Sequence, residues 1–159
     1  MDEADWERRV ALLWASMDEH TEADFLARME KLVAERPATD PVALFEHGSA
    51  LDSTGHPDLA VDHYRAALAA GLSGYRRRRA TIQLASSLRN LDQVQESVAL
   101  LTAELDNDPD DLDDAVRGFL ALALTSAGRE REAVALALSA LAPHLTRYNR
   151  SLANYAASL

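Results

Sequence analysis

The sequence predicts an all-α fold, in which antiparallel helix pairs stack on one another and a single helix covers the C-terminal end. Apolar residues recur at helical spacing along almost the whole chain, and no segment alternates apolar and polar residues long enough for a strand. Alanine and leucine, which favour helices, supply much of the 48% hydrophobic content. A pattern of small and large residues also repeats along the chain, which favours a stack of similar units.

Length, charge and cysteine usage exclude several classes of protein. The 159 residues are enough for one domain with a sizeable core. A net charge of −10 argues against general binding of nucleic acid or anionic membranes. The chain has no cysteine, and no apolar run approaches the roughly 18 residues that a membrane span needs. The N-terminus is charged where a signal peptide would be apolar, so we expect a cytoplasmic protein.

Proline and glycine breaks divide the helical pattern into about nine segments, each of ordinary helix length. Short connections between them imply antiparallel neighbours. Within a single domain over residues 1–159, we expect a degenerate hairpin over 3–37, repeats over 41–72, 75–109 and 110–142, and a capping helix over 144–158.

The repeat is defined by small residues at fixed steps. Its anchors Gly48, Ala85 and Ala121 lie 37 (85 − 48) and 36 (121 − 85) residues apart. Small residues at these positions let the two helices of a pair approach closely, whereas larger ones such as Tyr64 fill the space to the next pair. Because one pair cannot bury both of its faces, the pairs must stack.

The segment LFEHGSALDSTGHPDLAVDHYRAAL, residues 44–68, resembles the tetratricopeptide repeat, whose pattern is W-x2-L-G-x2-Y, then A-x3-F-x2-A, then P. The resemblance covers residues 41–142 well and 5–37 poorly, and the order of segments is similar to that of a group of small bacterial repeat proteins. Asp92 stands in place of the usual turn glycine, and Glu104 in place of the usual small residue. The resemblance implies a right-handed superhelix with a concave groove that binds protein or peptide.

No motif for catalysis or metal binding is visible. The histidines are not spaced as a helical metal pair, and neither a GxSxG elbow nor a glycine-rich phosphate loop occurs. The acidic run from Asp106 to Asp114 lacks the glycine and the distal glutamate of an EF-hand. We interpret it as a helix start, where carboxylates cap amides and suit the helix dipole. We therefore expect no enzymatic activity, no cofactor and no metal.

The segment GYRRRRATIQLASSLRN, residues 74–90, predicts the ligand-binding surface. On a helix it forms a polar stripe, and the resemblance implies that the first helix of each pair lines the groove. The repeat spacing then places residues from the first helices of the two neighbouring repeats on either side of this stripe, where they would form the walls of the groove. The predicted groove comprises Arg79, Gln83, Ser86, Arg89, Asn90, Phe45, Ser49, Phe119 and Leu122. Because arginine can hold a carboxylate through two hydrogen bonds, we expect an acidic or carboxylate-bearing peptide.

Other interpretations remain open at this stage. The arginines can instead pair with acidic residues of neighbouring helices, each exposed pair contributing about 0–1 kcal/mol. Arg77 falls on the apolar side of the helical wheel, so the helix is expected to begin after it. The alternative function is self-association, in which Phe119, Leu122 or Trp14 packs on a second copy, so a homo-oligomer is also considered.

The C-terminal tail predicts one more amphipathic helix. Leu145, Tyr148, Leu152 and Tyr155 fall on one helical face, which we expect to cover the last repeat. A partner-binding helix is the alternative interpretation.

Overall fold

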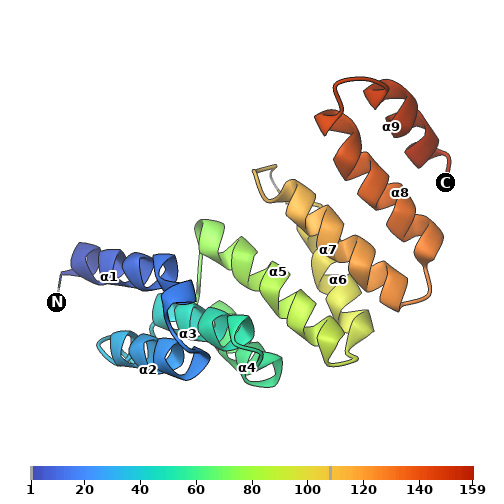
Figure 1. Ribbon diagram of the computed structural model, residues 1–159. Helices are drawn as coiled ribbons and strands as arrows, with labels where there is room; N and C mark the ends of the chain where they lie inside the picture. The colour runs from blue at the N-terminus through green and yellow to red at the C-terminus, as the bar shows by residue number, and fades with distance from the viewer. Residues whose placement is uncertain (1, 108) are drawn as a thin grey trace. The chain divides into compact units, whose positions relative to one another are not determined.

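The computed structural model describes residues 2–107 and 109–159, and every regular element in these ranges is helical. Figure 1 shows the helices of the described ranges and the turns that join them. They are α1 (Glu3–Ala15), α2 (Glu22–Val33), α3 (Pro41–Ser53), α4 (Pro57–Ala69), α5 (Gly74–Asn90), α6 (Val94–Glu104), α7 (Asp113–Ser126), α8 (Glu130–Leu141) and α9 (Asn149–Ala157), with 3-10 turns at η1 (Met17–Glu19) and η2 (Ala142–His144). The prediction of an all-α chain is confirmed.

The chain divides into two compact units, one ending at Ala80 and the other beginning at Thr81. The boundary lies within α5, so the first part of this helix belongs to the N-terminal unit and the rest to the C-terminal unit. Helix α5 includes all four consecutive arginines, and the expectation that it begins after Arg77 is wrong. Among the described residues, no helix combines the length and apolar character needed to cross a membrane.

Polar side chains and prolines begin the helices of the N-terminal unit. Asp2, Thr21 and Asp40 each accept a hydrogen bond from a backbone N–H in the first turn of α1, α2 and α3 respectively. Pro41 and Pro57 open α3 and α4, where the N–H that proline lacks would have no helical partner.

The acidic run before α7 begins its helix in a different way. Helix α7 starts at Asp113, and its N-cap residue Leu112 has no capping side chain. The Asp110 carboxylate instead accepts a hydrogen bond from the Leu112 N–H at 2.7 Å, within the loop. Asp113 and Asp114 lie in the first turn, where their charges suit the helix dipole. The acidic run therefore supplies carboxylates at the start of α7, one of which accepts an amide hydrogen bond, while Asp108 lies outside the described residues.

Three hairpin turns share one hydrogen-bonded geometry. In each, a backbone N–H just beyond the first helix reaches back to a carbonyl five residues earlier. The bonds join His56 to Leu51, Gln93 to Leu88 and Arg129 to Leu124, each at 2.9 Å. This Schellman closure needs a left-handed residue, and Gly55, Asp92 and Gly128 have φ values of 82°, 61° and 72°. Asp92 therefore adopts the backbone conformation of the glycine that it replaces.

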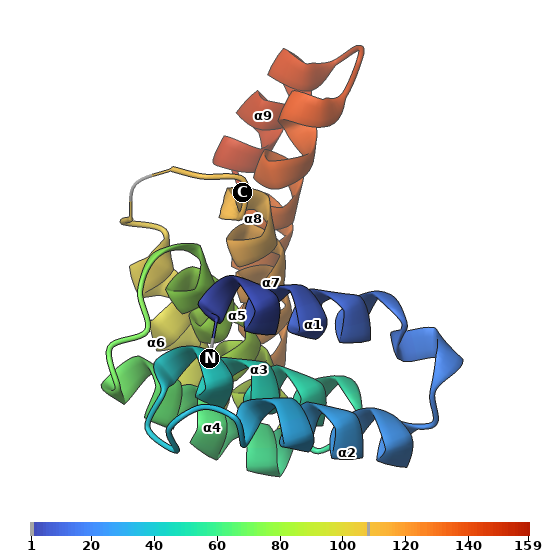
Figure 2. The same cartoon turned by 90° about the vertical axis from the view of Figure 1, so that its left-hand side faces the viewer.

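Helices α1 to α4 enclose the core of the N-terminal unit. Helix α2 lies against α3, and α3 lies against α4 (Figure 2). The largest fully buried side chains here are Trp6, Phe25, Met29, Phe45 and Tyr64. A Cβ atom at Gly48 would lie 3.0 Å from the Cβ of His63 and 3.2 Å from the Tyr64 ring. The predicted close crossing at Gly48 is confirmed.

A buried charge network ties α1, α3 and α5 together in the N-terminal unit. Glu46 is buried on α3, where its carboxylate accepts hydrogen bonds from Trp14 Nε1 at 2.8 Å and Arg76 Nε at 3.2 Å. Arg76 also donates to both carboxylate oxygens of Glu7, at 3.0 and 2.6 Å. The first arginine of the basic run is therefore a structural ion-pair residue.

The C-terminal unit encloses a second core, built from the later part of α5 together with α6, α7 and α8. Ala85 is fully buried in it, and its carbonyl accepts a hydrogen bond of 2.6 Å from Ser97 Oγ on α6. The predicted close approach at Ala85 is confirmed. Glu104, which departs from the repeat pattern, is buried and accepts a hydrogen bond from the Asn107 amide at 2.8 Å.

Helix α9 packs on α8, and of the four residues predicted for its packed face only Leu152 lies on it. The helix begins only at Asn149, so Leu145 and Tyr148 lie outside it. Tyr148 adopts a left-handed conformation, and Tyr148 and Tyr155 are both exposed. Ala156 is buried and Leu152 is half-buried, and these two residues, four apart, define the packed face.

Candidate functional site

The nine residues of the predicted groove divide between the two units. Arg79, Phe45 and Ser49 belong to the N-terminal unit. The C-terminal unit contains Gln83, Ser86, Arg89, Asn90, Phe119 and Leu122. We describe each unit separately.

In the N-terminal unit, Arg79 is supported by an aromatic ring. Its guanidinium lies over the Phe45 ring, 5.2 Å from the centroid, which is cation–π geometry. Phe45 and Ser49 are themselves fully buried. They are therefore core residues that underlie Arg79, which corrects the prediction that they form a groove wall. Arg79 remains half-exposed.

In the C-terminal unit, α5 and α7 are the first helices of adjoining hairpins. Their inward faces share one core, to which Ile82 and Ala85 contribute from α5. The 36-residue spacing from Ala85 to Ala121 sets Gln83 level with Phe119, and Ser86 level with Leu122. Phe119 is 36% exposed and Leu122 is 48% exposed, so α7 presents apolar surface to solvent.

Arg89 and Asn90 form a polar pair at the end of α5. Arg89 Nη2 donates a hydrogen bond of 3.0 Å to Asn90 Oδ1. The Nε atom of Arg89 is buried and has no hydrogen-bond partner within the described chain. The guanidinium is thus held in place while part of its donor capacity is unused.

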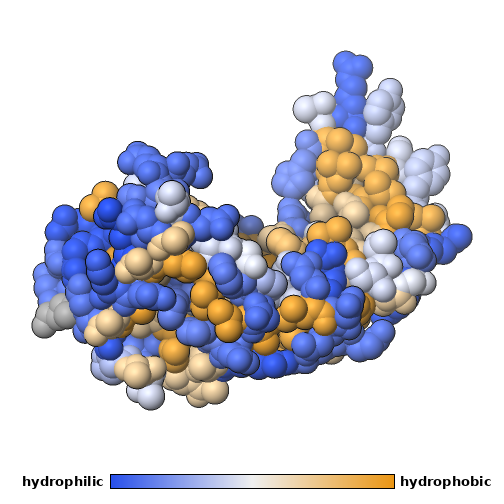
Figure 3. All heavy atoms as spheres, turned by 60° about the horizontal axis from the view of Figure 1, so that its bottom comes forward, coloured by the Kyte–Doolittle hydropathy of each residue, from blue (hydrophilic) through white to orange (hydrophobic). Residues whose placement is uncertain are grey.

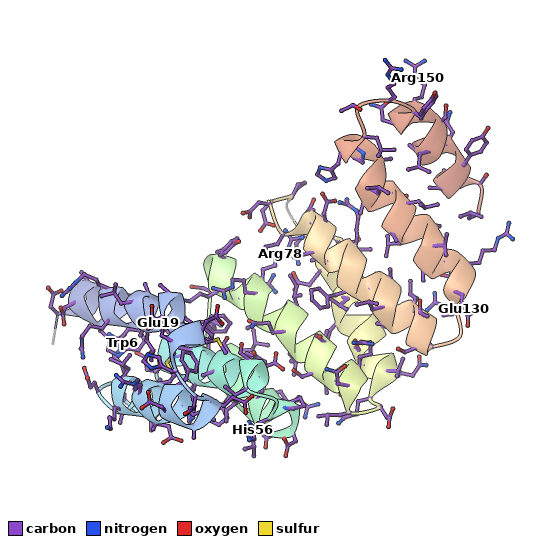
Figure 4. The ribbon with its side chains drawn as sticks, viewed as in Figure 1. Trp6, Glu19, His56, Arg78, Glu130 and Arg150 are labelled. Carbon is purple, nitrogen blue, oxygen red and sulfur yellow. The ribbon has the colours of Figure 1, made fainter. Side chains whose placement is uncertain are left out.

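The arginines differ in whether they pair with carboxylates. Ion pairs are formed by Arg8, Arg9, Arg28, Arg36, Arg76, Arg117 and Arg129. No ion pair joins Arg79 or Arg89 to an acidic side chain in the part of the chain that the structure describes. Within the basic run, Arg76 therefore pairs with carboxylates, those of Glu7 and the buried Glu46. The burial of Arg78, labelled in Figure 4, was missed because a helical wheel does not show which face a neighbouring helix covers.

Two histidines that are far apart in sequence meet in the N-terminal unit. The His47 and His63 rings lie edge to face with centroids 4.4 Å apart. They line a pocket of about 380 Å³ together with Glu30 and Arg36. Burial, and secondly the charge of His63, lower the pKa of His47. Across residues 2–107 and 109–159, no three histidine, aspartate or glutamate side chains are placed to hold a metal.

A serine–histidine–aspartate chain links α1 to α2. Ser16 Oγ lies 3.3 Å from His20 Nε2, and His20 Nδ1 lies 2.9 Å from Asp24 Oδ2. The Ser16 hydroxyl also donates to the Leu13 carbonyl at 3.1 Å. Because the hydroxyl has one proton, this bond competes with activation of Ser16 by His20. The arrangement suits a tie between helix ends better than nucleophilic catalysis.

Trp14, a residue considered for self-association, belongs to the N-terminal core. Its ring meets Phe25 edge to face, with centroids 5.1 Å apart, and its indole N–H binds Glu46. Trp14 is partly buried by these contacts.

Stacked hairpins with small residues at their crossings define the class of the protein, an α-solenoid of helical repeats. The profile of the tetratrico peptide repeat family matches residues 41–159, and the chain belongs to this family. Such a fold suggests a protein–protein interaction scaffold, and proteins of this kind are generally non-enzymatic.

Two solved structures share the fold. A Podosopora anserina kinesin light chain with nearly identical TPR-like repeats is 16% identical, with a TM-score of 0.67 over 99% of this chain and 96% of that one. The crystal structure of MamA protein is 20% identical, with a TM-score of 0.65 over 86% of this chain and 71% of that one. No curated protein matches the chain.

Proposed function

We propose that the protein is a non-enzymatic, cytoplasmic scaffold that binds an acidic protein segment through the first helices of its hairpins. The observation that carries this proposal is that Arg79 and Arg89, both on α5, take part in no ion pair within the described residues. The chain has 26 acidic and 16 basic residues, so carboxylates are abundant. Guanidinium groups that remain unpaired in such a protein are suited to a carboxylate supplied by a ligand.

The surroundings of Arg89 favour a ligand with both acidic and apolar side chains. Asn90 orients the guanidinium, so less side-chain freedom is lost on binding. Phe119 and Leu122 on α7 offer apolar contact in the same unit. Because the net charge of −10 repels an acidic ligand at long range, recognition depends on direct contact and not on electrostatic steering.

Selection from a displayed library of random peptides tests the proposal. Peptides selected on the wild-type protein are expected to be enriched in Asp or Glu close to Leu or Phe. Their affinity, measured by fluorescence anisotropy, should fall at least about tenfold with Arg89→Gln, a typical loss for one charge-assisted contact. Arg117→Gln is the matched control, because Arg117 is on α7 and already pairs with Asp114.

Two results of this experiment would contradict the proposal. Selected peptides without acidic residues, or equal losses from the two substitutions, would contradict the proposed carboxylate contact. Thermal melting of both variants checks that any loss of binding does not arise from unfolding.

A further inference from the structure

An apolar pocket lies in the C-terminal unit, where α6, α7 and α8 meet the end of α9. It has a volume of about 460 Å³, within the range of roughly 300–1,000 Å³ for ligand pockets. The leucines that line it are Leu105, Leu120, Leu124, Leu136 and Leu159. Figure 3 shows apolar side chains gathered on the surface of the C-terminal unit. The charged residues that line the pocket, Arg129 and Glu132, pair with each other at 2.6 Å, so an apolar occupant fits it better than a charged one.

Helix α9 runs antiparallel to α8 and borders this pocket with small side chains. Figure 4 shows Glu130, at the start of α8, and Arg150, at the start of α9, at opposite ends of the helix pair. From α9 itself, Ala156 and Ala157 line the pocket. A methyl group reaches less far than the side chain of leucine or phenylalanine, so α9 leaves the space beside the leucines of α7 and α8 unfilled.

The interactions that hold α9 on α8 are limited. The helix has nine residues, of which Ala156 is buried and Leu152 is half-buried. Its N-cap residue, Tyr148, makes no capping hydrogen bond through its side chain. Beyond the end of the helix, the Arg131 guanidinium donates a hydrogen bond to the Leu159 carbonyl. Because helices of this length are marginal in water and depend on their packing, local unfolding of α9 costs less free energy than unfolding of the whole unit.

We propose that α9 is an autoinhibitory helix, which an amphipathic helix of a partner protein displaces from α8. The occupant is a helix because this side of α8 already accommodates one in the structure. The partner's helix carries leucine, isoleucine or phenylalanine where α9 has Ala157, and this larger side chain fills the pocket.

The unfilled pocket explains how a separate helix can compete with a tethered one. Because α9 is joined to α8 by a short connection, it competes at a high effective concentration. The partner's helix overcomes this advantage by burying more apolar surface in the pocket than alanine buries. None of the residues that line the pocket belongs to the predicted groove, so the inference does not rest on the function proposed above.

Titration of the isotope-labelled full chain with a synthetic peptide, followed by nuclear magnetic resonance, tests the proposal. The peptide comprises residues 145–159 with the substitution Ala157→Leu, and the unchanged peptide is the matched control. The substituted peptide should bind at least about tenfold more tightly than the control, with a dissociation constant of about 0.1–1 mM because it competes with α9. As it binds, the backbone amide signals of α9 in the protein should move to the positions of an unfolded chain.

A reversible disulfide between α8 and α9 tests whether binding requires displacement. Ser139 of α8 and Ala153 of α9 line another pocket between these two helices, and the chain has no cysteine of its own. In the double variant Ser139→Cys and Ala153→Cys, oxidation ties α9 to α8 and reduction releases it. The reduced form should bind the peptide as the wild type does. The oxidised form should bind it at least about tenfold more weakly, because the state with α9 displaced is no longer populated.

The substitution Ala157→Leu in the protein itself provides a second variant. Because the new side chain fills the pocket from α9, it should raise the melting temperature, slow deuterium exchange of the α9 amides and weaken binding of the peptide. Ala99→Leu, at an exposed alanine of α6, is the control and should leave peptide binding unchanged.

Several results would overturn the proposal. Equal affinity of the oxidised and reduced forms would mean that the peptide binds without displacing α9. Equal affinity of the two peptides would mean that a larger side chain gains nothing from the pocket, so that α9 of a second copy would compete as well as a partner's helix. Absence of any change in the α9 signals, or an Ala157→Leu protein no more stable than the wild type, would also contradict it.

Discussion

Two glycines within helices occupy opposite environments. A Cβ at Gly48 of α3 would press on His63 and Tyr64, whereas one at Gly118 of α7 would meet no atom within 4 Å. Gly48→Ala should therefore lower the free energy of unfolding by about 1–3 kcal/mol through overpacking. Gly118→Ala should raise it by roughly 0.5–1 kcal/mol, because alanine favours a helix over glycine. Urea denaturation of both variants checks this, and changes of the same sign would contradict it.

Asp92 carries a conformational cost that glycine would remove. Its φ of 61° is left-handed, which disfavours a residue with a Cβ. Asp92→Gly should stabilise the protein by about 1 kcal/mol, seen as a higher denaturation midpoint. Asp106→Gly is the control, since Asp106 is exposed and its φ is not positive. If both changes destabilise, the strain at Asp92 is not real.

For single residues, the sequence predicts the structural environment best where the residue type and its place in the repeat decide it. Gly48 and Ala85 were predictable as close crossings because only small residues recur at that step of the repeat. The burial of Phe45 and Ser49 was not predictable, because it depends on which neighbours cover α3. The meeting of His47 and His63 likewise depends on how two helices align.

Among the helices, the Glu46 network makes α1, α3 and α5 interdependent. Removing Arg76 leaves the buried Glu46 carboxylate without its cation. Arg76→Ala should therefore lower the free energy of unfolding by about 3 kcal/mol. Arg8→Ala, which breaks only an exposed pair with Asp5, should lower it by no more than about 1 kcal/mol. Chemical denaturation compares the two, and equal effects would mean that the Glu46 network is not an important source of stability.

The α3–α4 hairpin should respond to mild acid through His47. Folding lowers the pKa of His47 from its ordinary value of 6.5, so the unfolded chain takes up this proton at higher pH than the folded chain does. The contribution of His47 is fully present above pH 6.5 and is lost as the pH falls through that value toward the folded pKa.

We expect the melting temperature to fall between about pH 7.5 and 5.5, and to fall less in His47→Gln. Asp24 and Glu35 have lowered pKa values because Arg28 and Arg9 hydrogen-bond to them, and their ordinary values are 3.8 and 4.5. Their contributions are therefore lost in a lower pH range. Identical pH slopes for the wild type and His47→Gln would contradict a role for His47.

For whole helices, the sequence predicts which segments are helical better than it predicts which face of each helix is buried. The proline and glycine breaks locate the helices because their effects on the backbone are local. The prediction for the packed face of α9 was right for Leu152 only, because the helix begins after Tyr148 and Tyr155 is exposed. Where a helix starts depends on its cap, and Tyr148 gives no capping signal.

In a repeat protein each helix pair is stabilised by contacts with the neighbouring pairs. The helices at the ends of the chain are therefore stabilised least. Helix α9 has one buried residue, Ala156, whereas α3 has seven. Amides of α9 should therefore exchange with deuterium faster than those of α3. Mass spectrometry of peptic peptides measures this, and equal protection would indicate a uniformly cooperative protein.

The repeat made the fold class predictable from the sequence, because self-similarity allows few architectures. The ligand surface was only partly predictable. The polar stripe on α5 follows from helical geometry, but which arginines already have partners depends on helices distant in sequence, as Arg76 and Glu7 illustrate.

Because the three hairpin turns share one backbone geometry, we expect that one turn can replace another. Each uses the same backbone closure around one left-handed residue, so the backbone path from one helix to the next is the same in all three turns. Transplanting Thr54-Gly55-His56 into the place of Leu91-Asp92-Gln93 should leave α5 and α6 crossing as before. Recombination at these turns would then add, remove or exchange whole hairpins. The length of the binding surface would change with the number of hairpins.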